Sequence, residues 1–278
     1  TVGDLLARRL GPSLPLVPCF LELTDPPILD TVERLARDGV SEIVVAPLML
    51  FGANHVKNDV PAAIAMARSR HPDLTIRYGV PLGVQPELLE VVDERIQAVE
   101  GAAAPFPRER TAVLVVERGS SDPDANAQVY HLSRMLWEGR GFGWVEPCFI
   151  GITRPSLSEG LARCRALGAE RIVVLPYFLF TGVLVRRISQ VVAEHAASLP
   201  GVELLVAEHL GAHPRLLDLA VRWIGEAVQG GVSMTCDRCV YRVPLVGFAH
   251  RVGQPQRSDG GHGLREGAGP HDHRHLRG

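Results

Sequence analysis

The feature that most constrains this 278-residue chain is an internal repeat. Three segments of the first half recur in the second half at a spacing of 128 or 129 residues: 17–27 in 146–156, 35–47 in 164–176, and 82–89 in 210–217. Similarity of this length at a nearly constant spacing indicates an internal duplication. We therefore expect the chain to fold as two copies of one unit.

Each copy alternates apolar strand patterns with amphipathic helix patterns. In the first copy we predict helix 28–38, strand 42–50, helix 57–70, strand 74–80 and helix 86–99. In the second copy we predict strand 112–116, helix 127–137, strand 171–179, helix 185–198, strand 202–207 and helix 214–229. Residues 42–50 are a nearly continuous apolar run, which is typical of a strand covered on both faces. Alternating βαβ units predict an α/β fold with parallel sheets flanked by helices.

The repeat also predicts the domain organisation. We expect a first lobe over 1–100, a linker over 101–110, a second lobe over 111–229, and a flexible Gly-, Arg- and His-rich tail over 230–278. The first copy begins inside a helix, at about Val2, and lacks a counterpart of strand 112–116. Because a sheet without that strand would leave backbone groups unpaired, we expect about 20 to 25 further residues before Thr1 in the natural protein.

Composition argues against several classes of protein. The formal net charge is -2, so no basic field indicates a nucleic-acid partner. No apolar run approaches the ~20 residues of a membrane helix, and the chain does not open with a signal-peptide pattern. The five cysteines, two of them in a CxxC motif, favour a reducing, cytoplasmic location over a disulfide framework.

Two polar side chains follow predicted strands in the first copy only. His55 follows strand 42–50, and Glu22 follows an earlier strand; the matching positions in the second copy are Leu184 and Gly151. Ligands of open α/β sheets bind outside the carboxyl ends of the strands, and an imidazole with a carboxylate suits a divalent first-row metal. The alternatives are an ordinary surface histidine and an exposed or ion-paired carboxylate.

Three segments carry a resemblance to a known family: 19–22, 47–61 and 119–126. They resemble the class II chelatases, and most of all the long-form branch that inserts cobalt into sirohydrochlorin. The resemblance covers about residues 1–230. It implies two chelatase-like lobes with the active-site cleft between them, and ATP-independent insertion of a divalent metal, Co2+ before others, into sirohydrochlorin in cobalamin biosynthesis. It implies no nucleotide cofactor.

The resemblance implies roles for individual residues. His55 matches the second histidine of the family site and Glu22 matches its acidic residue, so both are candidates for catalysis and for metal binding. The first family histidine has Arg118 at its position in the second copy, and its loop has no counterpart in the first copy.

The substrate implied by the resemblance carries many carboxylates, so its binding needs local cations. Lys57, Arg186 and Arg187 lie on the relevant loops and are the candidate substrate-binding residues. The alternative for each of them is a solvated position at the start of a helix.

The predicted tail holds a second candidate site. Cys236 and Cys239 form an MxCxxC element. The long-form family has this element, which implies an iron–sulfur cluster there. A zinc ion, a redox dithiol and idle thiols are the alternatives, because two cysteines supply half of the usual cluster ligands. Four nearby histidines suit either a loose metal store or plain disorder: His262, His271, His273 and His275.

The remaining alternatives concern activity, assembly and the other cysteines. A ferrochelatase of sirohaem synthesis, a non-catalytic metal-binding or delivery protein, and a two-lobed small-molecule-binding protein all fit tandem α/β units. We expect a monomer with an internal pseudo-two-fold axis, or a dimer formed through the tail. We expect Cys19, Cys148 and Cys164 to pack in the core.

Overall fold

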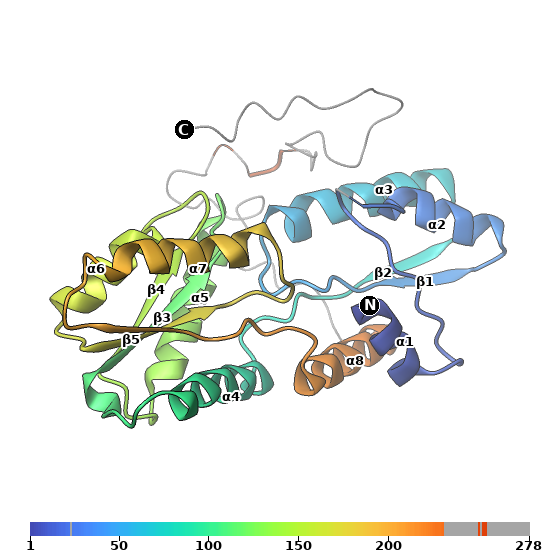
Figure 1. The fold of residues 1–278 in the computed structure, drawn as a ribbon. Coiled ribbons are helices and arrows are strands. Elements are labelled where there is room, and N and C mark those ends of the chain that lie inside the picture. Colours follow the sequence, from blue (N-terminus) through green and yellow to red (C-terminus); the bar gives the residue numbers. More distant parts are fainter. Residues whose placement is uncertain (23, 231–249, 251, 255–278) are drawn as a thin grey trace.

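The computed structural model describes residues 1–22, 24–230, 250 and 252–254 (Figure 1). They form two sheets in which every paired strand is parallel, with helices on the faces, so the predicted α/β class is confirmed. The smaller sheet pairs β1 (Glu42–Val45) with β2 (Thr75–Tyr78). The larger sheet has the order β4 (Trp144–Phe149), β3 (Thr111–Glu117), β5 (Arg171–Pro176), β6 (Glu203–Val206).

The helices follow the predicted pattern closely in most places. They are α1 (Val2–Leu10), α2 (Ile28–Arg37), α3 (Val60–Arg70), α4 (Pro86–Ala102), α5 (Pro123–Trp137), α6 (Leu157–Ala166), α7 (Val183–Ala196) and α8 (Pro214–Val228). The structure also has two short helical turns, the π-helix η1 (His55–Asp59) and the 3-10 helix η2 (Arg108–Arg110). None of the helices in the ranges described is long and apolar enough to cross a membrane.

The two copies share local backbone features at matching positions. An isolated parallel bridge joins Phe20 to Pro27 in the first copy and Phe149 to Ser156 in the second. The peptide bonds Asp25–Pro26 and Arg154–Pro155 are both cis. The duplication is therefore visible in the backbone as well as in the sequence.

Several strands are shorter than predicted, those of the first copy most of all; in the second copy, β5 ends at Pro176 and not at 179. The strand expected over 42–50 ends at Val45, and the strand expected before Glu22 is reduced to the single bridge at Phe20. In the larger sheet, the counterpart β5 lies between β3 and β6 and is fully buried. Within the described residues β1 pairs with β2 alone. Hydrogen bonds from a neighbouring strand therefore reach β1 on one side only, and the segment after Val45 is not held as a strand.

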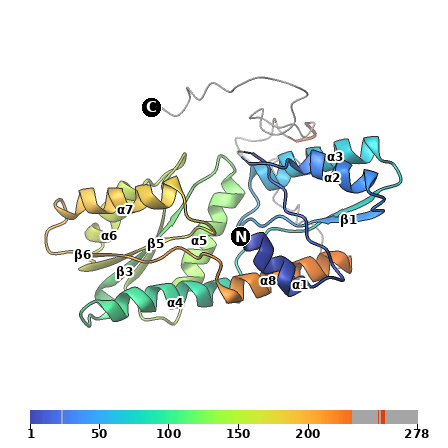
Figure 2. The same cartoon turned by 45° about the vertical axis from the view of Figure 1, so that its right-hand side comes forward.

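The last helices of the two copies are exchanged between the sheets. The α4 helix belongs to the first copy in sequence, but it packs against β5, β6 and α5 of the second copy. The α8 helix belongs to the second copy, but it packs against β1, β2 and α1 of the first (Figure 1, Figure 2). Each of these helices thus packs on the sheet of the other copy, and the sequence did not indicate this because an apolar helix face does not encode which sheet it will cover.

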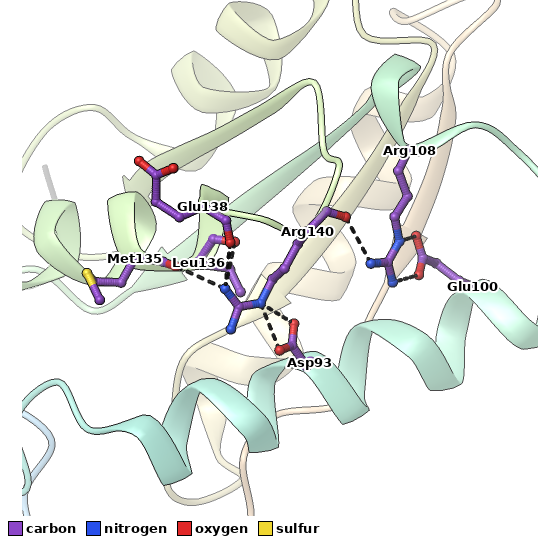
Figure 3. Close-up of polar contacts among 7 residues, drawn as sticks. All are labelled: Asp93, Glu100, Arg108, Met135, Leu136, Glu138 and Arg140. Carbon is purple, nitrogen blue, oxygen red and sulfur yellow. Dashed lines mark hydrogen bonds and ion pairs between the residues drawn. The ribbon is translucent and has the colours of Figure 1, made fainter.

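Ion pairs hold α4 onto the second copy (Figure 3). The Arg140 guanidinium donates to both Asp93 oxygens, at 2.7 and 2.8 Å, and also to the carbonyls at the end of α5. Arg108 pairs with Glu100 at 2.6 Å and donates to the Arg140 carbonyl at 3.1 Å. The region predicted as a linker is therefore ordered, with α4 reaching into it and η2 leading directly into β3.

One apolar core runs through both halves. It joins α1 and α8 to α4, β3 and β5, with buried members that include Leu6, Leu50, Val115 and Leu216. Two smaller clusters lie under α6 and α7 and under α2 and α3. Because a continuous core ties the halves together, the loops at the two sheets are held in a fixed relation to each other.

Candidate functional site at the carboxyl ends of the two sheets

The carboxyl ends of the two sheets meet at the junction of the lobes. The Phe51 ring, beyond the end of β1, stacks on Tyr177, which directly follows β5, with ring centroids 5.6 Å apart. The η1 turn of the first copy also reaches Asp122 at the start of α5 in the second. Loops of both copies therefore contribute to one region, which is where open α/β sheets place their ligands.

His55 and Glu22 are brought together in this region. His55 opens η1, Glu22 lies in the loop before α2, and their Nε2 and Oε1 atoms are 3.8 Å apart. Both side chains are partly exposed, so a small ligand can reach them. Two residues distant in sequence thus present an imidazole nitrogen and a carboxylate oxygen to the same point.

Asp59 is the site residue that sequence reasoning missed. Its Oδ2 lies 2.6 Å from His55 Nδ1, and its side chain is buried. We assign the ring proton to Nδ1, because the carboxylate can only accept, which leaves the lone pair of Nε2 on the side of Glu22. The available signal was the spacing of four residues, which places two side chains on one face of a helical turn.

The shape of the η1 turn follows from a proline. The Val60 N–H donates to the His55 carbonyl, five residues back. In a regular helix the ring of Pro61 would clash with the carbonyl of Lys57, and the wider turn avoids this. The second copy has Gln190 at the position of Pro61, and α7 is a regular helix there. The turn that carries His55 is thus specific to the first copy.

Lys57 does not have the environment predicted for a substrate-binding cation. Its side chain is buried, and Nζ lies 2.8 Å from Asp122 and 3.0 Å from Asp124 of the second copy. Burial acts to lower the pKa of Lys57, but the hydrogen bonds and charges of the two aspartates outweigh it, and the pKa lies above its usual value. These partners lie so far away in sequence that they left no signal near Lys57.

Arg186 and Arg187 remain exposed at the first turn of α7. Neither forms an ion pair with any residue that the structure describes. Two exposed apolar side chains precede them in the chain, Phe180 at 50% and Val183 at 70% exposure. The carboxyl edge of the larger sheet therefore offers cations next to apolar surface.

The second copy has no counterpart of the His55–Glu22 pair. Leu184, at the position of His55, packs against the core under α6 and α7. A Cβ atom on Gly151, at the position of Glu22, would lie 2.4 Å from the Arg118 carbonyl, so no carboxylate side chain fits there. Arg118 itself is exposed.

Three cysteines fall where the sequence placed them. Cys148 and Cys164 are buried and Cys19 is half-buried, all as free thiols, which confirms the core-packing prediction. Burial raises the pKa of the Cys164 thiol to about 12. Cys236, Cys239, His262, His271, His273 and His275 lie outside the described residues. Across the described ranges, no group of three or more His, Cys, Asp and Glu side chains converges as a metal site.

The fold and site define a class: a two-lobed α/β protein made by duplication, with a histidine–carboxylate site in one copy at the meeting point of the sheets. The CbiX family matches this chain twice, over residues 4–99 and 112–227. The chain belongs to the CbiX family.

Similar proteins have names that indicate a shared chemistry. The sirohydrochlorin cobaltochelatase of Priestia megaterium is 40% identical over 228 residues, covering 82% of this chain and 74% of that protein. A sirohydrochlorin ferrochelatase of the same organism is 33% identical over 199 residues, covering 71% and 72%. The structure of SirB from Bacillus subtilis with Fe3+ is similar with a TM-score of 0.65 and 29% identity, covering 78% and 84%.

Proposed function

We propose that this chain inserts a divalent metal, with Co2+ as the preferred ion, into sirohydrochlorin without ATP. The observation that carries the proposal is the placement of His55 Nε2 opposite Glu22, with Asp59 behind the ring. The cobaltochelatase at 40% identity supports cobalt, and the ferrochelatase at 33% makes Fe2+ the second candidate. In both cases the metal ion is a substrate.

The chemistry required is a double exchange. The macrocycle releases two pyrrole protons as one M2+ ion enters, and the ion exchanges its water for ring nitrogens. His55 and Glu22 provide one nitrogen and one oxygen, which suit a first-row divalent ion in transit. A neutral imidazole can also accept a proton through Nε2, and the Asp59 carboxylate stabilises the imidazolium that results.

Arg186 and Arg187 complete the proposed substrate site. A guanidinium pairs with a carboxylate through parallel hydrogen bonds, so these two side chains suit the acidic substituents of the macrocycle. The exposed Phe180 and Val183 provide apolar surface for the ring itself. A site with both cations and apolar groups binds a macrocycle with several carboxylates in preference to a small anion.

The tail supports a separate proposal. Cys236 and Cys239 bind an iron–sulfur cluster that needs further ligands, which a second chain can supply through a tail-mediated dimer. The three free thiols of the described residues fit a reducing, cytoplasmic setting. Iron content and molar mass of the anaerobically purified protein, compared with a Cys236→Ser variant, test both points.

The test of the proposal is metal insertion in vitro. Recombinant protein is mixed anaerobically with sirohydrochlorin and Co2+, and the shift of the macrocycle absorbance is followed. Saturable acceleration over the rate without protein is the expected result, and parallel runs with Fe2+ and Ni2+ rank the metals. Tight Co2+ binding without acceleration would instead indicate the metal-delivery alternative.

A further inference from the structure

Lys57 lies two residues after His55 in the same η1 turn and connects that turn to the other copy. Its Nζ contacts Asp122 at 2.8 Å and Asp124 at 3.0 Å. The three side chains are 5%, 3% and 19% exposed, respectively, so water screens these pairs little. We call Lys57, Asp122 and Asp124 the inter-lobe cluster.

The aspartates of the cluster are themselves fixed. Asp122 is the N-cap of α5, and its Oδ1 accepts the Asp124 N–H at 3.0 Å while its Oδ2 faces Lys57. Carboxylates at a helix N-terminus are also favoured by the helix dipole. Lys57 is therefore tied to a rigid element of the second copy.

The η1 turn is held by further contacts on its own side. The Tyr78 hydroxyl of β2 donates to the Val56 carbonyl at 2.9 Å, and Asn58 donates to the second oxygen of Asp59 at 2.9 Å. Three consecutive residues after His55 are thus anchored: Val56 to the smaller sheet, Lys57 to the second copy, and Asn58 to the carboxylate that orients the imidazole.

The repeat shows that this arrangement is specific to the copy with the histidine. Arg186 occupies the position of Lys57 in the second copy, where it is exposed on a regular helix and makes no ion pair with any described residue. A cationic side chain alone does not produce the cluster. In the part of the chain that the structure describes, the π-helical turn of the first copy faces two aspartates of the second copy, whereas the matching segment of the second copy is the regular helix α7.

We propose that Lys57 is a positioning residue, whose ion pairs with Asp122 and Asp124 hold the His55 imidazole at a fixed place relative to the second copy. This inference rests on the proposed function, because the position matters for a macrocycle bound between His55 and the arginines of α7. Lys57 also offsets one of the two negative charges of Asp122 and Asp124, which reduces their repulsion of an acidic substrate.

The test compares Lys57→Met, Lys57→Arg and Asp124→Asn with the wild type. Loss of positioning is expected to lower kcat for Co2+ insertion by on the order of 10- to 100-fold in Lys57→Met, since small misplacements of catalytic groups have effects of that size. Lys57→Arg keeps both charges paired and is expected to retain most of the activity. Arg9→Met, which removes the exposed Arg9–Asp218 pair, is the matched control and is expected to behave as wild type.

A second readout separates this inference from the proposed function. In 15N-histidine NMR spectra, the His55 ring signals are expected to shift or broaden in Lys57→Met and in Asp124→Asn, but not in Arg9→Met. Asp124→Asn removes a single charge and serves if Lys57→Met does not fold. Wild-type kcat together with unchanged His55 signals in a folded cluster variant would overturn the inference. If the wild type is inactive but the His55 signals still shift in Lys57→Met and Asp124→Asn, the proposed function is overturned and the positioning role is retained.

Discussion

His55 and Asp59 form a 2.6 Å contact between the imidazole Nδ1 and a carboxylate oxygen within one π-helical turn. A carboxylate behind a ligating histidine fixes the tautomer and the orientation of the ring. The pairing makes His55 a directed ligand and base in place of a freely rotating surface histidine.

Asp59→Asn is expected to reduce metal insertion by about 10- to 100-fold, the range typical for partners of metal-ligating histidines. An amide can donate to Nδ1 and so favour the tautomer that carries its proton on Nε2, the wrong nitrogen for metal. Steady-state kinetics at saturating Co2+ measure the effect, with the exposed Asp73→Asn as control. Equal rates for the two variants would show that the contact has no part in the reaction.

Replacing Arg186 and Arg187 together by alanine is expected to raise KM for sirohydrochlorin about 10-fold and to leave kcat nearly unchanged, since each exposed charge pair contributes up to about 1 kcal/mol. The difference from wild type is expected to shrink at high salt. A double substitution of Arg34 and Arg37 on α2 is the control, since both are exposed cations on a single helix turn. An increase in KM of the same size in the control would point to net charge alone.

Arg140→Met is expected to lower the free energy of unfolding by about 2 kcal/mol, because it removes hydrogen bonds to a charged partner and to the end of α5 (Figure 3). Chemical denaturation measures this loss. Arg134→Met, which removes an exposed pair with Glu138 just past the end of α5, is expected to change stability far less. A similar loss in both variants would contradict the role assigned to the α4 contacts.

Glu117 gives a pH-dependent prediction. Burial raises the pKa of this carboxyl above 4.5, although backbone N–H groups of Gly119 and Arg118 oppose the shift. The Glu117 carboxyl therefore holds its proton more tightly in the folded state than in the unfolded state. Protonated Glu117 contributes its full stabilisation below about pH 4.5, and this contribution is lost as the pH rises through the raised pKa.

Unfolding measured between about pH 4 and pH 8 should therefore show wild type losing stability relative to Glu117→Gln as the pH rises. The difference is expected to become constant above the raised pKa. Parallel stability curves across this range would show that the carboxyl has the same pKa in both states.

The sequence predicted the features that depend on local pattern. Buried strands such as β3 and β5 are recognisable as apolar runs, and His55 and Glu22 stand out because the second copy has Leu184 and Gly151 instead. A pattern within one segment is sufficient for such conclusions.

The features it missed depend on partners distant in the chain. Lys57 pairs with Asp124, 67 residues away, so its burial could not be read from its own loop. The exchange of α4 and α8 was likewise hidden, since each apolar face fits either sheet. Strand β1 ends early because its neighbours, and not its own residues, determine how far a ladder extends.

The central claim is tested most directly by His55→Ala with the exposed His131→Ala as control. Both proteins are assayed for Co2+ insertion into sirohydrochlorin by absorbance, after circular dichroism shows that each is folded. We predict that His55→Ala is inactive, with a rate equal to that of the reaction without protein, and that His131→Ala matches the wild type. Undiminished insertion by folded His55→Ala would contradict the assignment of the site.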